Sequence, residues 1–223
     1  INLMMKKILL IGYGDIAERV HNQLDNNLFE IYGISRNNSK KIKNFIQWDW
    51  LASELPKIDN KIFHSLVFIP KPIGLDIDGY NDGFIRSSEN IFKLSKKISF
   101  EKFISISSTR VYGNNKSSIP IESKTNPDDF RGKIILDYEK NQIKRYAEKL
   151  VILRFSGLYK SDVTKKPLNC LHRNNAAKAI NYFIENDFNF SSYEIFNCSE
   201  NSTSSINNDS KLKNTGLIFD SYD

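Results

Sequence analysis

The sequence has few of the residues that mark specialised classes of protein. It contains only two cysteines, Cys170 and Cys198, and their separation is not that of a metal-binding pair. In the absence of secretion signals, both are expected to be reduced thiols in the core. Neither a disulfide framework nor a metal site is therefore predicted.

Long apolar segments are also missing. The apolar run near the start, Ile8–Ile11, stops at Gly12 and is far shorter than the roughly 20 residues of a membrane span. No small-residue cleavage site follows it, so we expect no signal peptide, no membrane anchor and a cytoplasmic protein. The chain opens with Ile1 and carries Met4 and Met5, which leaves its true start open.

The positive charge of the sequence is not concentrated in one place. A formal net charge of +6 would favour a nucleic-acid partner if the lysines formed a basic stripe. They occur instead as scattered pairs such as Lys6-Lys7 and Lys96-Lys97. Asn, Ile and Lys are all abundant, as A+T-rich coding would produce, so we expect no nucleic-acid partner.

What the sequence does contain is a regular alternation of strand-like and helix-like segments. With 223 residues, 40% hydrophobic and 26% charged, it can form one soluble domain with a substantial core. Strands are predicted at 7–11, 30–35, 65–69, 102–107 and 150–155, and helices at 15–25, 87–97, 132–149 and 175–185. This alternation is typical of βαβ units on a parallel sheet.

The predicted fold class is therefore α/β, a doubly wound parallel sheet of the Rossmann type with a small irregular C-terminal lobe. The dinucleotide-binding body is assigned to residues 4–155 and 175–185. The lobe, on the substrate side, is assigned to residues 156–174 and 190–223.

A glycine-rich motif lies between the first expected strand and the first expected helix. Gly12, Gly14 and Ala17 form the pattern G-x-G-x-x-A. The first glycine permits a tight turn, the second lets the backbone approach a pyrophosphate at the helix N-terminus, and the alanine keeps the helix close to the strand. Asp15 and Ile16, inside the motif, complete the predicted cofactor loop. The alternative is a tight turn without a ligand.

The choice between NAD and NADP is expected to be made about 20 residues after such a motif. An acid at that point binds the ribose hydroxyls, whereas an arginine accommodates a 2′-phosphate. After the second expected strand the chain has no acid but has Arg36. We therefore predict NADP as the cofactor, with NAD as the alternative. A solvated loop role for Arg36 also stays open.

Four later segments carry a family resemblance. They are F-I-S-I-S-S-T-R-V-Y-G at 103–113, L-R-F-S-G-L-Y at 153–159, L-H-R-N-N-A-A at 171–177 and F-N-C at 196–198. On these segments the chain resembles the extended short-chain dehydrogenase/reductases, the NAD-dependent epimerase/dehydratase family, over nearly its whole length. The resemblance implies a nicotinamide cofactor and a small-molecule substrate such as a sugar nucleotide. It also implies that Asp49 lies near the adenine, with a turn residue as the alternative.

The chain departs from this family at the catalytic pair. Active members carry Tyr and Lys as Y-x-x-x-K on one face of the helix after the V-Y-G turn, where the ammonium lowers the pKa of the phenol. Matching Glu139 to the glutamate that ends the family motif places Arg131 and Ile135 at those two positions. The pair is therefore expected to be lost. The Y-x-x-x-K of Tyr112 and Lys116 falls in a turn sequence and is interpreted as coincidental.

Two residues are candidates for contact with the substrate. Ser108 matches the catalytic hydroxyl of the family, and both a ligand contact and a cap of the turn are open to it. Arg131 is a candidate for binding an anionic substrate group, because its side chain stays charged at any working pH. Tyr138 lies on the same helix, but Gln142 stands where a lysine would be needed.

His172 is expected to have a structural role at the start of the last helix, with Asn174 or Asn175 as the helix cap. Three functions then stay open. The favoured one is an NAD(P)-dependent oxidoreductase or epimerase with non-standard acid/base groups. The others are a catalytically silent NADP-binding sensor or regulator and an assembly factor without a ligand, against which the glycine motif argues. A homodimer is also left open.

Overall fold

The structure of this chain, a computed structural model, describes residues 4–37, 42–52, 54–113, 124–161, 169–189, 191–200 and 210–222. In chain order its elements are β1 (Lys6–Ile11), α1 (Asp15–Gln23), β2 (Phe29–Ser35), β3 (Asn44–Gln47), β4 (Ile62–Phe68), α2 (Ile77–Tyr80), the π-helix η1 (Asn81–Arg86), α3 (Ser87–Ser95), β5 (Ser99–Ser108), the 3₁₀ helix η2 (Thr109–Tyr112), α4 (Phe130–Tyr146), the 3₁₀ helix η3 (Ala147–Lys149), β6 (Leu150–Phe155), β7 (Gly157–Tyr159), β8 (Cys170–His172), α5 (Arg173–Glu185), β9 (Glu194–Cys198) and α6 (Ser210–Asn214). In the parts of the chain that are described, every helix is too short or too polar to span a bilayer.

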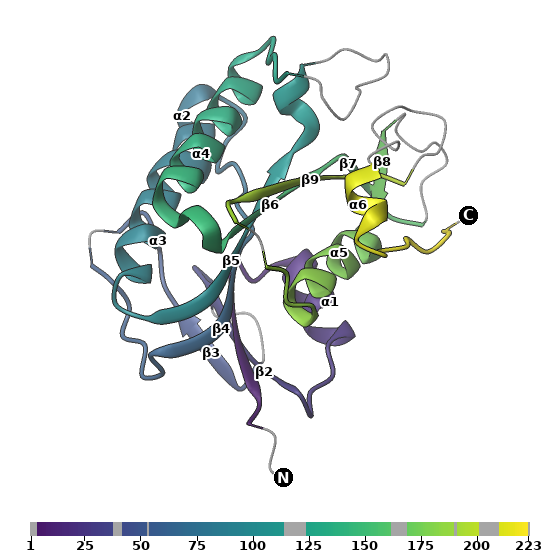
Figure 1. The fold of residues 1–223 in the computed structure, drawn as a ribbon. Coiled ribbons are helices and arrows are strands. Elements are labelled where there is room, and N and C mark those ends of the chain that lie inside the picture. The colour runs from purple at the N-terminus through teal and green to yellow at the C-terminus, as the bar shows by residue number, and fades with distance from the viewer. Residues whose placement is uncertain are drawn as a thin grey trace.

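A seven-stranded parallel sheet forms the centre of the protein (Figure 1). Its strand order is β3-β2-β1-β4-β5-β6-β9, and each neighbouring pair runs parallel. The chain moves outward from β1 to β3 and then returns to β4 beside β1. The predicted doubly wound Rossmann architecture is confirmed, and its topological switch point lies between β1 and β4, where such sheets bind their ligands.

The strands are apolar on both faces because helices cover both. Ile8 and Leu10 of β1 belong to one hydrophobic core, whereas Leu9 and Ile11 belong to the other. Side chains alternate between faces along a strand, so a single apolar run supplies both cores. Helices α1 and α5 cover the first face, and α2, α3 and α4 cover the second (Figure 1).

Several short elements were not predicted from the sequence, among them strand β3 and the π-helix η1. Strand β3 has only four residues and none of them is fully buried, so its period-2 pattern is too short to recognise. The π-helix η1 extends the predicted helix at 87–97 toward the N-terminus. Its glycine, Gly83, has a packing reason: a Cβ there would lie 2.3 Å from the carbonyl oxygen of Lys71.

The last strand, β9, lies in the main sheet. It pairs with β6 in a register that places Phe196 beside Leu153, and the Phe196 side chain is 2% exposed in the core of the α1/α5 face. Part of the segment assigned to the lobe at 190–223 therefore belongs to the sheet. The small β7-β8 sheet falls within 156–174. The division of the chain into a cofactor body and a substrate lobe stays a prediction.

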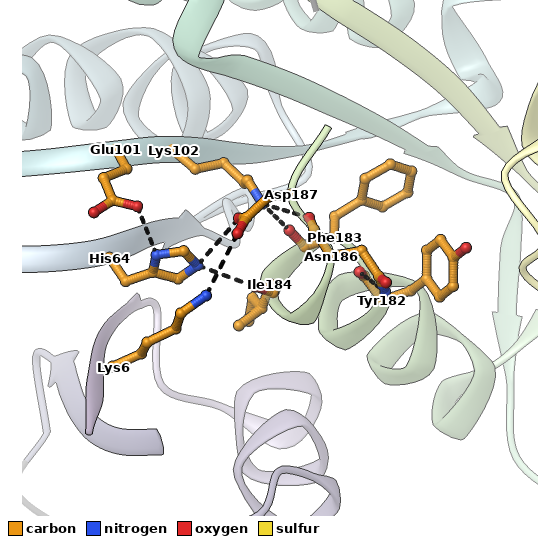
Figure 2. A network of polar contacts seen from close by, with 9 residues as sticks. All are labelled: Lys6, His64, Glu101, Lys102, Tyr182, Phe183, Ile184, Asn186 and Asp187. Atoms are coloured by element: carbon orange, nitrogen blue, oxygen red, sulfur yellow. Dashed lines mark hydrogen bonds and ion pairs between the residues drawn. The ribbon is translucent and has the colours of Figure 1, made fainter. Parts of the chain in front are cut away.

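At the amino end of the sheet, a buried lysine holds the C-terminus of α5 (Figure 2). Lys102 donates hydrogen bonds to the carbonyl oxygens of Phe183, at 2.6 Å, and Asn186, at 2.8 Å. The last carbonyls of a helix have no partner within the helix, and a cation favours that end of the helix dipole. Burial lowers the pKa of Lys102 from its usual range.

A histidine and a carboxylate complete this network. His64 is 6% exposed; its Nδ1 lies 2.9 Å from the Glu101 carboxylate and its Nε2 lies 3.1 Å from the carbonyl oxygen of Ile184 (Figure 2). Asp187, just after the helix, forms ion pairs of 3.6 Å with both Lys6 and Lys102. The C-terminus of α5 is thereby attached to strands β1, β4 and β5, which fixes the position of its N-terminus at the opposite edge.

Candidate functional site

The first glycine of the loop after β1 is required by the backbone. Gly12 has φ +95°, a conformation that other residues rarely adopt. A Cβ at this position would also lie 2.6 Å from the carbonyl oxygen of Ile69, just after β4. Ala17, in the first turn of α1, is completely buried against the sheet. Both residues have the structural roles that the motif predicts for them.

The second glycine is not required by the fold. Gly14 is the N-cap of α1, with φ −115° and ψ −154°, an extended conformation open to any residue. A Cβ at Gly14 would meet no atom within 4 Å, and no side chain caps the first turn of the helix there. A glycine at this point therefore leaves open the approach to the backbone amides of α1, which is the geometry that binds phosphate groups.

The negative charge of the loop is balanced by two arginines. Asp15 accepts hydrogen bonds from Nε of Arg19, at 3.2 Å, and from Nη1 of Arg173 at the start of α5, at 2.9 Å. Burial alone would raise the pKa of Asp15, but its hydrogen bonds and charge interactions with these arginines lower it below the usual range. The Asp15 side chain thus serves to attach α5 to the glycine loop.

Arg36 and Asp49 lie just beyond the carboxyl ends of β2 and β3, the two strands outward from the glycine loop. Both side chains are exposed. The guanidinium carbon of Arg36 lies 5.9 Å from the ring centre of Trp50. Asp49 accepts a hydrogen bond from the amide of Leu51 at 3.0 Å, so its role in a turn is seen directly. Contact of either residue with a cofactor stays a prediction.

A cavity of about 510 Å³ opens on the other side of the glycine loop. It is lined by Ile16 of α1, by Ile69 after β4, by Ser108 at the end of β5 and by Phe155 at the end of β6. The cavity therefore lies at the carboxyl ends of the strands and at the switch point, and its size is that of a small-molecule site. Of the predicted site residues, Ile16 and Ser108 meet here.

Ser108 is placed for both of its predicted roles. Its Oγ accepts a hydrogen bond from the amide of Arg110 at 3.2 Å and so caps η2. The same side chain lines the cavity. A hydroxyl that accepts from the backbone still has its own hydrogen to donate.

Arg131 lies outside the lining of this cavity. Its guanidinium carbon is 5.7 Å from the ring centre of Tyr80 and 5.5 Å from that of Phe130, and Nη2 donates to the carbonyl oxygen of Leu75 at 3.5 Å. Ser108 and Arg131 therefore do not line the same cavity. Contact between Arg131 and an anionic group stays a prediction.

The tyrosines near the expected catalytic position are buried. Tyr138 is completely buried, its hydroxyl has no hydrogen-bond partner in the described part of the chain, and burial raises its pKa well above the usual range. Ile135 is 3% exposed in the same core. Lys116, of the Y-x-x-x-K that was interpreted as coincidental, lies outside the described residues.

A buried ion pair lies behind the cavity and was not singled out from the sequence. Arg154 of β6 donates to Glu139 of α4 through Nε at 2.9 Å and Nη2 at 2.6 Å, and Ser107 donates to the same carboxylate at 2.5 Å. Burial alone would lower the pKa of Arg154, but the hydrogen bonds and charge of Glu139 raise it. The arginine of the L-R segment and the glutamate of the helix motif thus form one structural unit.

The start of α5 is capped by His172. Its Nδ1 accepts a hydrogen bond from the amide of Asn174 at 3.1 Å, and its ring stacks on Tyr222 with 3.8 Å between ring centres. The expectation that Asn174 or Asn175 provides the cap is therefore wrong, because the histidine before them already accepts from the first turn. Asn175 instead exchanges two hydrogen bonds with the backbone of Asp220, which holds the C-terminal segment.

Comparison with known proteins places the fold but gives no close relative. No protein-family model matches the sequence, and no curated protein matches it. Among solved structures, the chain is similar to UDP-glucuronic acid 4-epimerase from Bacillus cereus in complex with NAD, with 18% identity, a TM-score of 0.67, and 95% of this chain and 83% of that chain covered.

Two further solved structures have the same arrangement. UDP-N-acetylglucosamine 4-epimerase from Methanobrevibacter ruminantium M1, in complex with UDP-N-acetylmuramic acid, has 18% identity and a TM-score of 0.68, over 91% of this chain and 79% of that one. MoeE5 in complex with UDP-glucose and NAD has 14% identity and a TM-score of 0.71, over 90% and 78%. The chain therefore has the Rossmann fold seen in NAD-dependent sugar-nucleotide epimerases.

Proposed function

We propose that the protein binds a nicotinamide dinucleotide at the glycine loop and acts on a sugar nucleotide or a related carbonyl compound in the adjacent cavity. The observation that carries this proposal is Gly14. Nothing in the fold requires a glycine there, whereas a ligand at the N-terminus of α1 does, because a side chain would occupy the path to the helix amides. Solved proteins of the same fold are complexes with NAD.

The residues present fit such a group. The amides of the first turn of α1 would hold the pyrophosphate, and Arg36 would pair with a 2′-phosphate, which favours NADP over NAD. When bound, the nicotinamide supplies hydride transfer to or from the substrate. Ser108 accepts from the Arg110 amide and keeps its own hydroxyl hydrogen, with which it would donate to the carbonyl oxygen of the substrate.

We also propose that the Tyr–Lys pair is lost, so that the acid/base groups are non-standard. Arg131 and Ile135 hold the expected positions, and the burial of Tyr138 keeps its phenol protonated. Loss of such a pair removes a contribution of roughly 10²–10⁴ in rate. This observation favours a second candidate, a catalytically silent NADP-binding sensor.

The test is a fluorescence titration of the purified protein with NADPH and with NADH, repeated on Gly14→Val. Wild-type protein is expected to bind NADPH saturably, and the folded variant is expected not to. A folded Gly14→Val protein with wild-type affinity would overturn the proposed cofactor site. Turnover against a panel of sugar nucleotides and simple carbonyl compounds then separates the enzyme from the sensor.

A further inference from the structure

The cavity beside the glycine loop contains one ionisable side chain among its described lining residues, and that side chain is Arg110. Arg110 follows Ser108 by two residues, in the turn that η2 forms at the end of β5. The remaining lining is apolar or carries hydroxyl and amide groups. A single cation in such a wall determines which ligand charge the cavity can accept.

Among the described residues, Asp129 is the one ion-pair partner of the Arg110 guanidinium. Nη1 forms an ion pair of 2.8 Å with Asp129, which itself caps α4 by accepting from the amide of Gly132 at 2.8 Å. A guanidinium has five N–H donors, and a carboxylate bound through one nitrogen leaves Nε and Nη2 able to bind a second anion. Asp129 does not line the cavity, so the anchor lies behind the guanidinium.

Two buried polar atoms in the same wall have no partner within the described residues. They are Oγ of Ser156, on a side chain that is 5% exposed, and Oδ1 of Asn169. Ser156 follows β6 and Asn169 precedes β8, so both come from parts of the chain other than the turn that carries Arg110. Buried polar atoms left unpaired cost stability, so in native proteins each is expected to have a partner such as a bound ligand, an ion or an ordered water.

We propose that Arg110, Ser156 and Asn169 form a subsite for a hydroxylated substrate that carries an anionic oxygen group. Arg110 binds the anionic oxygens, Ser156 donates to one of them, and Oδ1 of Asn169 accepts from a substrate hydroxyl. This inference rests on the proposed function and specifies its substrate class. It gives to Arg110 the role that the sequence suggested for Arg131.

The anionic group has two chemical sources, the carboxylate of a sugar acid and the phosphate of a sugar phosphate or sugar nucleotide. The experiment uses wild-type protein saturated with NADPH and titrates it by calorimetry with UDP-glucuronic acid, UDP-glucose, glucose 1-phosphate and glucose. Tighter binding of UDP-glucuronic acid than of UDP-glucose identifies the carboxylate. Equal binding of those two, together with binding of glucose 1-phosphate but not glucose, identifies the phosphate.

Three variants test the residues. Arg110→Gln is expected to lower the affinity for the anionic probe by about tenfold or more relative to wild type, because a charge-assisted contact is lost. Its affinity for NADPH is expected to stay unchanged. The matched control is Arg86→Gln, which removes an arginine ion-paired to Asp82 on the surface of η1. It is expected to leave both affinities unchanged.

Ser156→Ala keeps the pair of Arg110 and Asp129 intact. It removes a buried hydroxyl that has no hydrogen-bond partner in the described part of the chain, so it is expected to maintain or raise the melting temperature while weakening probe binding about threefold to tenfold. A residue with a merely structural role would not separate stability from binding in this way. Asn169→Leu is expected to behave like Ser156→Ala.

The outcomes are distinguishable from failure of the proposed function itself. If NADPH does not bind to wild type, the proposed function fails. If NADPH binds but no anionic probe binds saturably, or if Arg110→Gln and Ser156→Ala both retain wild-type probe affinity, the subsite is overturned and the cofactor site stands.

Discussion

Arg154 Nη1 donates a hydrogen bond to the hydroxyl of Tyr112 at 2.7 Å, joining strand β6 to the V-Y-G turn across 42 positions of the chain. The same hydroxyl donates to Oδ1 of Asn197 on β9 at 3.0 Å. Tyr112 is 7% exposed, and its hydroxyl both donates and accepts a hydrogen bond inside the protein. Tyr112 is therefore a structural tyrosine.

Tyr112→Phe is expected to destabilise the protein by about 1–3 kcal/mol, because it leaves the buried Arg154 donor and the Asn197 acceptor without this partner. Tyr138→Phe is the matched comparison, since its buried hydroxyl makes no close hydrogen bond within the described residues and its removal is expected to cost less stability than that of Tyr112. Urea unfolding of both variants measures the difference. Equal losses of stability would contradict this interpretation.

The two loop glycines are expected to respond in opposite ways to substitution. In Gly12→Ala an alanine would have to adopt a positive φ, and its Cβ would clash with the Ile69 carbonyl oxygen. The substitution is therefore expected to lower the free energy of unfolding by at least about 1–3 kcal/mol. Gly14→Ala is expected to leave stability within about 0.5 kcal/mol of wild type. Thermal unfolding of the two proteins checks this, and a Gly14→Ala protein as unstable as Gly12→Ala would contradict it.

Arg36 is expected to determine the preference for NADPH over NADH. Arg36→Ala removes the guanidinium proposed to pair with a 2′-phosphate, so NADPH affinity should fall by about tenfold or more while NADH affinity barely changes. Fluorescence titration of both cofactors measures the ratio. Equal losses of affinity for NADPH and NADH would show that Arg36 does not bind the 2′-phosphate.

Lowering the pH is expected to weaken the ion pair between Asp129 and Arg110. Burial alone would raise the pKa of Asp129, but the hydrogen bond from the Gly132 amide and the charges of Arg110 and Arg131 hold it below the usual range. Between the folded and unfolded pKa values the unfolded chain binds more protons. The contribution of Asp129 to stability is therefore complete above about pH 4 and is lost as pH falls through its folded pKa.

The variant for this effect is Asp129→Asn, which is expected to be less stable than wild type at neutral pH and to approach it as the pH is lowered from about 5 to about 2. Urea midpoints across that range measure the convergence. A difference between the two proteins that stays constant with pH would exclude the carboxylate as its source.

Ordinary carbonyl reduction is expected to be slow or absent, since the structure offers no exposed phenol beside an ammonium on α4. The measurement is NADPH consumption with a panel of carbonyl compounds. Brisk turnover that disappears in Tyr138→Phe would mean that a displaced tyrosine does the chemistry and that the interpretation of α4 is wrong.

The sequence predicted those features that depend on neighbouring residues. The turn at Gly12, the packing of Ala17 and the apolar run of β1 follow from local sterics and periodicity, and they are found as expected. Asp15 was expected near the cofactor. Its hydrogen bond with Arg173 joins residues 158 positions apart, so no local sequence pattern could predict it.

The cavity wall could not be predicted for the same reason. Arg110 and Ser156 both lie within segments that carry the family resemblance, but at positions for which the sequence suggested no role. They line one cavity only because β5 and β6 are neighbours in the sheet and end at the same edge. Likewise, His172 caps α5 because of how β8 enters the helix, whereas the sequence offered two asparagines that are better caps by residue type.

Helix α5 is attached at both ends, and this has a mechanical consequence. Lys102 holds its last carbonyls at the amino edge of the sheet, and Arg173 holds Asp15 at the carboxyl edge, with about 20 Å of helix between them. Because a helix of this length is stiff and is attached at both ends, a displacement of one end is expected to move the other. Loosening of the Lys102 end is therefore expected to reach the glycine loop, and amide hydrogen exchange at residues 14–18 in Lys102→Met would report it without any ligand present.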